Sequence, residues 1–393
     1  MKKPVIVSAV RTIAGSFGGS LKSLSAGDLG AAVVAEVVKR AGITPEDVDQ
    51  LIFGCGWQAG IGPNIARICA VRGGLPHSVP AYTVNVRCAS SIQAMIDACR
   101  SIMCGDNDVV IAGGTESGSN VPFLIPQARW GARMWDFPAY DGLHMDGFKC
   151  ALAGMFMGNT AELLAEKYDI SRQEQDEFAL WSHQKASKAV AEDKFRDEIL
   201  SIEVKQRKKT VIVDQEEIPR PDASLEKMLR LPAVFQEGGT VTAGNSCALC
   251  DCASAVVIMS EEKAKSLGLT PMARILGYAE AGVDPKYMGI GPVAAVPKAL
   301  KKAGLELKDI DLIELNEAFS AQYIACDREL HFDRDKVNVH GGAISLGHPV
   351  GATGTKLVTT NLNTLRQYDK TLGLVSMCVG GGQGLAVVLE RLS

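Results

Sequence analysis

The stretch Lys39-Arg40-Ala41-Gly42-Ile43, followed closely by Asp47-Val48-Asp49-Gln50-Leu51, recurs later in the chain as Lys301-Lys302-Ala303-Gly304-Leu305 and Asp309-Ile310-Asp311-Leu312-Ile313. The spacing within the two copies is identical. In each copy a helical apolar pattern ends at the glycine, which suits the left-handed position after a helix, and a short apolar strand follows the acidic turn. The sequence therefore predicts two copies of one helix–strand unit.

Each copy continues in the same way. Asn85-Val86 and Asn338-Val339 lead into a loop and a helical pattern, and the apolar runs at 109–113 and 372–379 then suit buried strands. This alternation predicts an α/β fold with parallel or mixed sheets covered by helices. Residues 119–245 have no counterpart in the second copy, so we interpret them as an inserted lobe.

Composition excludes several classes of protein. With 393 residues, 47% of them hydrophobic and 22% charged, the chain can bury a large core. A net charge of −4 gives no field that would gather nucleic acid or a membrane surface. The uncharged run 371–389 is long enough for a membrane helix, but its five glycines favour strand, loop and strand. The eleven cysteines are odd in number and scattered, which predicts reduced thiols in the cytoplasm.

Cys378 and His348 both lie among glycines, which leave room for a substrate to approach the backbone N–H groups. The first interpretation is that Cys378 is a nucleophile and His348 its base. The run 341–354 contains five glycines, and Pro349 restricts the backbone at the histidine. A functional role for His348 is therefore favoured over a structural hydrogen bond.

Cys88 follows a strand-like run and precedes the helical pattern at 92–103. At a helix N-terminus the unpaired N–H groups and the helix dipole are expected to lower the pKa of a thiol. The alternative is a small core residue in a tight turn. Asn316-Glu317 follows the strand of the second repeat, at the end of the strand where α/β sheets place their sites.

Two further clusters have ordinary explanations. Cys247, Cys250 and Cys252 suggest a metal, but their spacing is poor for ligands and no second cysteine or histidine pair lies near, so no metal site is predicted. The basic run Lys205, Arg207, Lys208 and Lys209 is typical of a solvated face, although a phosphate-rich ligand could use it.

Four motifs together resemble those of the thiolases, which include acetyl-CoA acetyltransferases and 3-ketoacyl-CoA thiolases. They are Asn85-x-x-Cys88, Asn316-Glu317-Ala318-Phe319, Gly347-His348-Pro349-x-Gly351-Ala352-Thr353-Gly354 and Cys378-x-Gly380-Gly381-Gly382-Gln383-Gly384. The resemblance covers essentially the whole chain. It implies duplicated α/β/α halves in five layers, with a first half at 1–118 plus 246–270 and a second half at 271–393. The inserted loop domain, 119–245, is expected to bind CoA and mediate tetramerisation.

The resemblance also implies roles for the site. Cys88 matches the nucleophile that forms an acyl-enzyme thioester, which revises the first interpretation of Cys378. His348 would activate Cys88 and, with Asn316 holding a water, stabilise the enolate. Cys378 would transfer the α-proton. The backbone N–H groups of Cys88 and Gly380 would form a second oxyanion hole.

Contacts to CoA are implied at five positions. Arg220 matches the arginine on the nucleotide side, and Met157, Ala318 and Phe319 match the pantetheine tunnel. Cys247 stands where a serine commonly contacts pantetheine. The chain also departs from the family at Phe156, where short-chain members usually have histidine, and at Ser91, where glycine is usual. These departures bear on acyl-chain preference.

The leading hypothesis is reversible thiolase chemistry: two acetyl-CoA giving acetoacetyl-CoA and CoA, or thiolysis of a 3-ketoacyl-CoA. No permanently bound cofactor is expected, because CoA and acyl-CoA are substrates and products. A ketoacyl synthase acting on acyl carrier protein shares the fold but lacks an acid/base cysteine, so Cys378 argues against it. A scaffold that only holds CoA esters is disfavoured by an intact Cys88. Family resemblance also implies a homo-oligomer, either a dimer or a tetramer.

Overall fold

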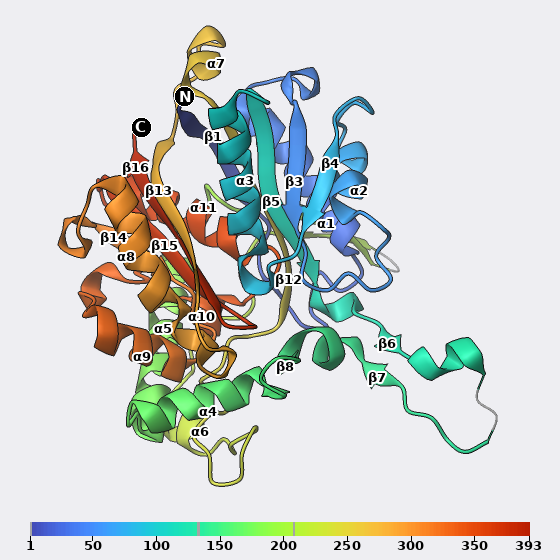
Figure 1. The fold of residues 1–393 in the computed structure, drawn as a ribbon, viewed down its shortest axis with the longest axis vertical. Coiled ribbons are helices and arrows are strands. Elements are labelled where there is room, and N and C mark those ends of the chain that lie inside the picture. Colours follow the sequence, from blue (N-terminus) through green and yellow to red (C-terminus); the bar gives the residue numbers. More distant parts are fainter. Residues whose placement is uncertain (1, 132–133, 207–208) are drawn as a thin grey trace.

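The computed structural model describes residues 2–131, 134–206 and 209–393. Its main feature is one large mixed sheet, in which the strands follow the order β14-β15-β16-β13-β1-β12-β5-β3-β4 (Figure 1). The short strand β2 (Gly15–Ser16) pairs with β12 beside this path. The strands of the path are β1 (Pro4–Arg11), β3 (Gln50–Gly54), β4 (Ala81–Val84), β5 (Val109–Ser117), β12 (Cys250–Ser260), β13 (Ala273–Gly282), β14 (Leu312–Leu315), β15 (Leu372–Val379) and β16 (Gln383–Arg391).

The two repeats form two halves with the same strand order. In the first half β3 pairs in parallel with β5, and β5, β12 and β1 continue antiparallel. In the second half β14 pairs in parallel with β15, and β15, β16 and β13 continue antiparallel. The halves meet where β1 pairs with β13 at Val5↔Arg274 and Ile6↔Ala273. The predicted duplication is therefore confirmed.

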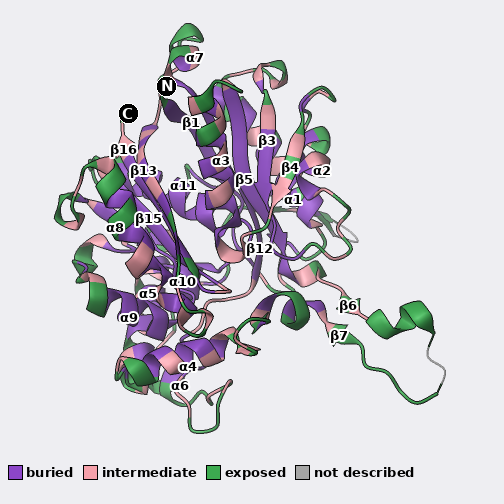
Figure 2. Ribbon diagram, in the orientation of Figure 1, coloured by how far each residue is buried: buried purple, intermediate pink, exposed green. Residues whose placement is uncertain are grey.

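Helices divide the molecule into five layers, as expected. Helix α1 (Ala26–Ala41) covers the outer face of the first half, and α8 (Gly291–Ala303) covers that of the second. Helices α3 (Ser90–Cys104) and α11 (Thr353–Gln367) contact each other between the two halves of the sheet. Strands β1, β5, β12 and β14 are buried along their whole length, whereas β4 at the edge of the sheet is only partly buried (Figure 2).

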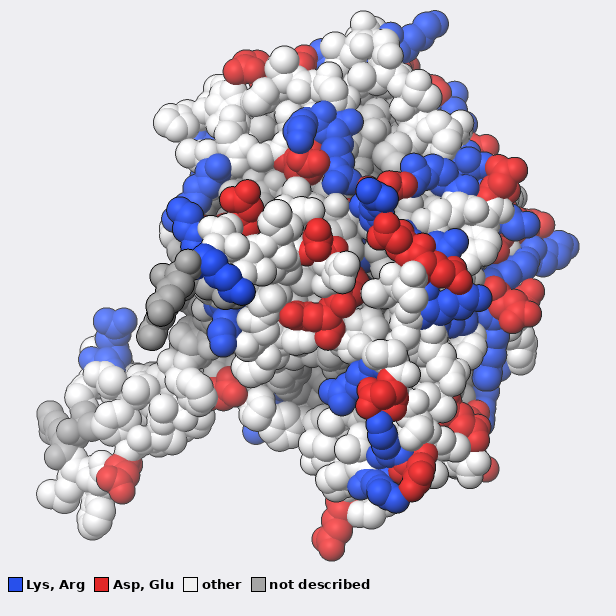
Figure 3. Space-filling model, turned by 180° about the vertical axis from the view of Figure 1, so that it is seen from behind, with Lys and Arg blue, Asp and Glu red and all other residues white. Residues whose placement is uncertain are grey.

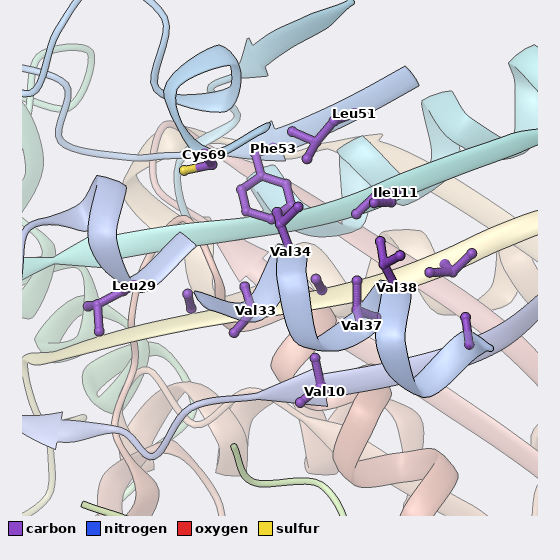
Figure 4. Packing of buried hydrophobic residues seen from close by; sticks show 14 of the residues in the cluster. Val10, Leu29, Val33, Val34, Val37, Val38, Leu51, Phe53, Cys69 and Ile111 are labelled. Atoms are coloured by element: carbon purple, nitrogen blue, oxygen red, sulfur yellow. The ribbon is translucent and has the colours of Figure 1, made fainter. Parts of the chain in front are cut away.

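Local signals fix the ends of the repeated helices. Helix α1 begins at a capping box in which Ser25 and Asp28 satisfy each other's backbone N–H groups. It ends at Gly42, and α8 ends at Gly304, with φ values of 69° and 71° that glycine adopts without steric penalty. Valines of α1 then pack on Phe53 and Ile111 of the sheet (Figure 4). Burying each such side chain contributes roughly 1.5–3 kcal/mol.

The lobe between β5 and β12 is a mixture of helices, hairpins and irregular chain. Its helices are α4 (Met157–Lys167), α5 (Arg172–Ala191) and α6 (Leu225–Leu229), and its hairpins pair β6 (Phe123–Leu124) with β7 (Tyr140–Asp141), β8 (Lys149–Cys150) with β9 (Met155–Phe156), and β10 (Ile202–Gln206) with β11 (Lys209–Val213). The chain around β6 and β7 projects from the body as an arm (Figure 1). Arg11 of β1 ties the lobe to the sheet through buried ion pairs with Glu198 and Glu216.

Three expectations from the sequence can be compared with these elements. The run 371–389 forms β15, a turn and most of β16, as its glycines predicted. Among the described residues, no helix is both long and apolar enough to cross a membrane. Of the basic run, Lys205 lies on β10 and Lys209 on β11, whereas Arg207 and Lys208 lie outside the described residues.

Candidate active site

Cys88 lies in a tight 3-10 turn, Arg87–Ala89, that leads from β4 into α3. The hydroxyl of Ser90 holds this turn, because it accepts the N–H of Val86 at 2.9 Å and donates to the carbonyl of Arg87 at 2.6 Å. Arg87 has a φ of 48°, a left-handed conformation that non-glycine residues rarely adopt. Such strain concentrates at functional turns. The expected position of Cys88 at a helix N-terminus is confirmed.

The expected direction of the Cys88 pKa is wrong. Burial raises the pKa of the thiol above its ordinary value, although the backbone N–H of Gly380 and the charge of Arg87 act in the opposite direction. Loss of hydration penalises the thiolate more than these two groups stabilise it. The free enzyme therefore holds Cys88 as a thiol, which needs a base to become a nucleophile.

The hydrogen bonds of His348 fix which of its ring nitrogens carries the proton. Its Nδ1 lies 2.7 Å from the hydroxyl of Thr353, and that hydroxyl donates its single proton to the carbonyl of Pro349 at 2.9 Å. The Nδ1 atom is therefore the protonated nitrogen, and it donates to Thr353. Nε2 is buried and has no hydrogen-bond partner among the described residues. The unprotonated nitrogen is thus available to a reacting group.

Electrostatics keep this histidine neutral. Burial lowers the pKa of His348 to about 3, and the positive charges of Lys356 and Arg87 act in the same direction. A neutral imidazole can accept a proton, whereas an imidazolium cannot. The backbone N–H of His348 donates to the carbonyl of Ala248 at 2.9 Å, so the loop is also fixed to the segment before β12.

Cys378 lies at the end of β15 and is buried. Burial and the nearby thiol of Cys88 raise the pKa of Cys378 well above its ordinary value. Cys378 therefore holds its proton firmly unless a neighbouring group takes it. The strand ends one residue later, so Gly380 can aim its N–H at the sulfur of Cys88.

One cavity of about 60 Å³ brings these groups together. It is lined by Trp57, Arg87, Cys88, Gly147, Phe148, Met157, Cys247, Met288, Ala318, Phe319, His348, Val350, Cys378 and Gly380. A larger cavity of about 480 Å³ adjoins it and shares Phe148, Met157, Cys247 and Phe319. The small cavity therefore has a wide, mostly apolar approach.

Two predicted site residues do not line these cavities. Asn316 directly follows β14 and is fully buried, and both polar atoms of its side-chain amide lack partners among the described residues. An amide in this state needs a water or ligand group to satisfy it. Arg220 is exposed in the lobe, where its backbone N–H donates to Nδ1 of His183 at 3.3 Å.

Sequence reasoning missed Glu116, a fully buried carboxylate at the end of β5. It accepts the N–H groups of Gly56, Trp57 and Gly351 at 2.8, 3.1 and 2.8 Å. One side chain thereby fixes the loop after β3 to the loop that carries His348. An acidic residue at the end of a long apolar run was the available signal.

The three departures from the family pattern have separate surroundings. Ser91 is buried, and its hydroxyl accepts the N–H of Thr355 in the first turn of α11 at 3.0 Å. Phe156 lines the larger cavity, with its ring edge-on to His144 at 5.4 Å between centroids. Cys247 lines both cavities, and burial raises its pKa to about 12.

The other two cysteines of the sequence cluster, Cys250 and Cys252, are buried on β12. In the described ranges, no three histidine, cysteine or acidic side chains converge on a point that could hold a metal ion.

Comparison with known proteins gives a consistent result. Residues 4–262 match the family model for the N-terminal domain of thiolases, and residues 269–391 match that for the C-terminal domain. The chain is 48% identical over 394 residues to an acetyl-CoA acetyltransferase of Escherichia coli strain K12, with 100% of both chains covered. Among solved structures, the acetyl-CoA acetyltransferase of Bacillus anthracis is similar at a TM-score of 0.98 and 44% identity, covering 100% of this chain and 99% of that chain. The corresponding structure from Syntrophomonas wolfei has a TM-score of 0.98 and 41% identity, with 100% of both chains covered.

Proposed function

The chain belongs to the thiolase family, and from that premise we propose that Cys88, His348, Asn316 and Cys378 carry its chemistry through an acyl-enzyme on Cys88. It is an acyltransferase that catalyses reversible Claisen condensation and thiolysis of acyl-CoA thioesters. The observation that supports the assignment is the small cavity, which Cys88 and Cys378 line together with a neutral His348 whose Nε2 has no hydrogen-bond partner among the described residues.

Thiolysis begins at Cys88. Nε2 of His348 takes the thiol proton, and the thiolate attacks the 3-keto carbon of the substrate. His348 and a water held by the unpartnered amide of Asn316 stabilise the oxygen on which charge develops. The bond between C2 and C3 then breaks, and Cys378 protonates the departing enolate to give acetyl-CoA.

The second step returns the enzyme to its starting state. CoA passes its thiol proton to Cys378 and attacks the acyl-enzyme, whose carbonyl oxygen is held by the N–H groups of Cys88 and Gly380. Cys88 leaves as a thiolate and recovers its proton from His348. Run in reverse, the same steps condense two acyl-CoA molecules.

The route for CoA follows the adjoining cavity of about 480 Å³. Met157, Cys247 and Phe319 line both cavities, which suits the mostly apolar pantetheine arm, and Ala318 lies at the inner end. Arg220 forms no ion pair with any described residue and is exposed, so it is available to a phosphate of the nucleotide. We propose CoA as a substrate that leaves, with no permanently bound cofactor.

The test of the acyl-enzyme compares Cys88→Ser with Cys104→Ser, which removes an exposed thiol away from the cavity. The Cys88 variant should lose about 1,000-fold or more of acetoacetyl-CoA thiolysis, because a hydroxyl is a far weaker nucleophile here. Mass spectrometry of wild type with acetyl-CoA should find the acetyl group on Cys88. Full activity of Cys88→Ser would contradict the mechanism, and transfer only from acyl carrier protein would favour the ketoacyl synthase reading.

We further propose that the protein is a cytoplasmic homo-oligomer, a dimer or a tetramer. All eleven cysteines are free thiols, which suits a reducing compartment. The projecting arm exposes Phe123, Trp130 and Trp135 at 68%, 87% and 87% of their surface. Figure 3 supports this reading, because the arm carries few charged side chains whereas acidic and basic groups are interspersed over the body. Exposed aromatic side chains in such numbers are typical of protein interfaces.

A further inference from the structure

Arg87 places a cation in the wall of the reactive cavity. The residue directly precedes Cys88, is half-buried, and lines the cavity together with Cys88, His348 and Cys378. Its Nη1 donates to the carbonyl of Gly56 at 2.9 Å. Within the described residues, no other protein acceptor meets the guanidinium and no carboxylate pairs with it. The other donors of the guanidinium make no hydrogen bond to a described residue, and the side chain lines the cavity.

The guanidinium is also held in place. It lies over the ring of Trp57 at 5.3 Å, and the edge of Phe148 supports that ring at 5.5 Å between centroids. Trp57 is only 3% exposed, and Gly147 permits its close approach, since a Cβ there would lie 2.5 Å from the indole nitrogen. The backbone N–H of Arg87 donates to the side chain of Asn85 at 3.0 Å. The cation is thus preorganised by a rigid aromatic wall.

A preorganised cation in the wall of a mostly apolar cavity, with no carboxylate partner among the described residues, is suited to a ligand group that carries negative charge. The reacting carbonyl oxygens do not need it, because the residues described above stabilise them. The thioester and pantetheine groups carry no anion at this depth. The remaining source of negative charge is the acyl group itself, and guanidinium matches a carboxylate in a planar, two-pronged geometry.

We infer that the enzyme acts on 3-ketoacyl-CoA esters whose acyl chain ends in a carboxylate, with Arg87 binding that carboxylate against the face of Trp57. The inference rests on the proposed function. Because Arg87 is adjacent to Cys88 in the chain, it suits a carboxylate about two methylene groups from the carbonyl that becomes attached to the sulfur. The acyl-enzyme would then be a dicarboxylic half-thioester.

The reaction balances without any further reagent. The Cys88 thiolate adds to C3, and the electron pair of the breaking C2–C3 bond passes to C2, which Cys378 protonates to give acetyl-CoA. CoA then displaces Cys88 from the acyl group, giving its thiol proton to Cys378, and Cys88 recovers its own proton from His348. The carboxylate stays paired with Arg87 through both steps.

The test compares two substrates of equal chain length, 3-oxoadipyl-CoA, which ends in a carboxylate, and 3-oxohexanoyl-CoA, which ends in a methyl group. The quantity measured is the ratio of their kcat/KM values in wild type, Arg87→Gln and Arg87→Lys. Arg100→Gln is the control, because it removes an exposed arginine from α3, the helix that follows the turn of Arg87. The ratio cancels any general effect of Arg87 on the thiol.

Wild type should prefer the carboxylate substrate, and Arg87→Gln should lower the ratio by about 100-fold, as loss of one partner of a desolvated charge pair does. Arg87→Lys should keep part of the preference, and Arg100→Gln all of it. An unchanged ratio in Arg87→Gln overturns the inference, even where both rates fall, because the cation would then serve the Cys88 thiolate. The inference is also overturned if wild type cleaves acetoacetyl-CoA but has equal kcat/KM values for 3-oxoadipyl-CoA and 3-oxohexanoyl-CoA. Wild type that cleaves none of the three substrates, acetoacetyl-CoA, 3-oxohexanoyl-CoA and 3-oxoadipyl-CoA, would instead refute the proposed function.

Discussion

At the scale of single residues, the protonation state of the site depends on a hydroxyl group. His348 is buried and neutral, and the hydroxyl of Thr353 determines which of its nitrogens carries the proton. Without that acceptor at Nδ1, the proton could occupy Nε2, which would leave no lone pair to face the cavity. In the proposed mechanism, Thr353 is therefore a positioning residue for His348.

Thr353→Val tests this dependence, because valine keeps the shape of threonine but removes the hydroxyl. We expect kcat for acetoacetyl-CoA thiolysis to fall by about 100-fold, the lower end of what a positioned base contributes, with a much smaller change in KM. Thr359→Val is the matched control on the same helix, where a buried hydroxyl only bonds the carbonyl of Thr355. Equal kcat values for the two variants would contradict the role of Thr353.

At the scale of elements, the site depends on how two equivalent helices meet. Helix α3 follows Cys88 and α11 follows His348, and the two lie between the halves of the sheet. The residue before α11, Ala352, has no side-chain group to cap the helix, and Ser91 of α3 supplies the missing acceptor to Thr355. Gly354 allows this close approach, since a Cβ there would lie 2.4 Å from the side chain of Ile92. Helix α3, which follows Cys88, thereby caps α11, which follows His348.

Replacing Ser91 with alanine should leave the N–H of Thr355 buried and unpaired. We expect a loss of about 1 kcal/mol in the free energy of unfolding, measured in urea, since that is the usual effect of removing a cap. Ser171→Ala removes the cap of α5 in the lobe and should destabilise the protein comparably. Only Ser91→Ala should also lower kcat and slow the alkylation of Cys88 by iodoacetamide. The coupling of the two helices would be wrong if both variants kept wild-type alkylation rates.

At the scale of the whole molecule, the lobe has two different surfaces. Toward the body it is fixed by the buried pairs of Arg11 with Glu198 and Glu216, and removing one partner of such a network typically costs about 3–5 kcal/mol. Away from the body, the arm presents apolar side chains to solvent. A rigid base carrying an apolar, projecting arm is suited to contact a second copy of the chain.

Sedimentation velocity provides the measurement for this proposal. Wild type should sediment as a dimer or tetramer, and the double variant Trp130→Ser, Trp135→Ser should shift to a smaller species because it removes the most exposed aromatic groups of the arm. The control is Ile212→Ser, which changes a residue of the lobe that is 61% exposed but lies on β11, outside the arm. A monomeric wild type would refute the oligomer, and an unchanged double variant would exclude these two tryptophans from the interface.

Local patterns were sufficient for most of the fold. The repeated Gly42 and Gly304 end equivalent helices, and the apolar runs between them form strands, because these signals act through backbone conformation and burial near the residue itself. The direction of the Cys88 pKa could not be predicted in this way. It depends on how much water the folded protein removes from the sulfur, and the residues that remove it come from distant parts of the chain.

The sequence by itself determined that the chain is duplicated, that it resembles a thiolase, and which cysteines and histidine to examine. Only the tertiary structure decided that Thr353 orients His348, that Glu116 joins two loops, and that Arg87 stands beside Trp57 with no carboxylate paired to it in the described part of the chain. The physical reason is that charge, hydration and hydrogen-bond partners depend on which side chains meet in space. Trp57 and Arg87 become neighbours only after β3 and β4 pair and both loops close over the same end of the sheet.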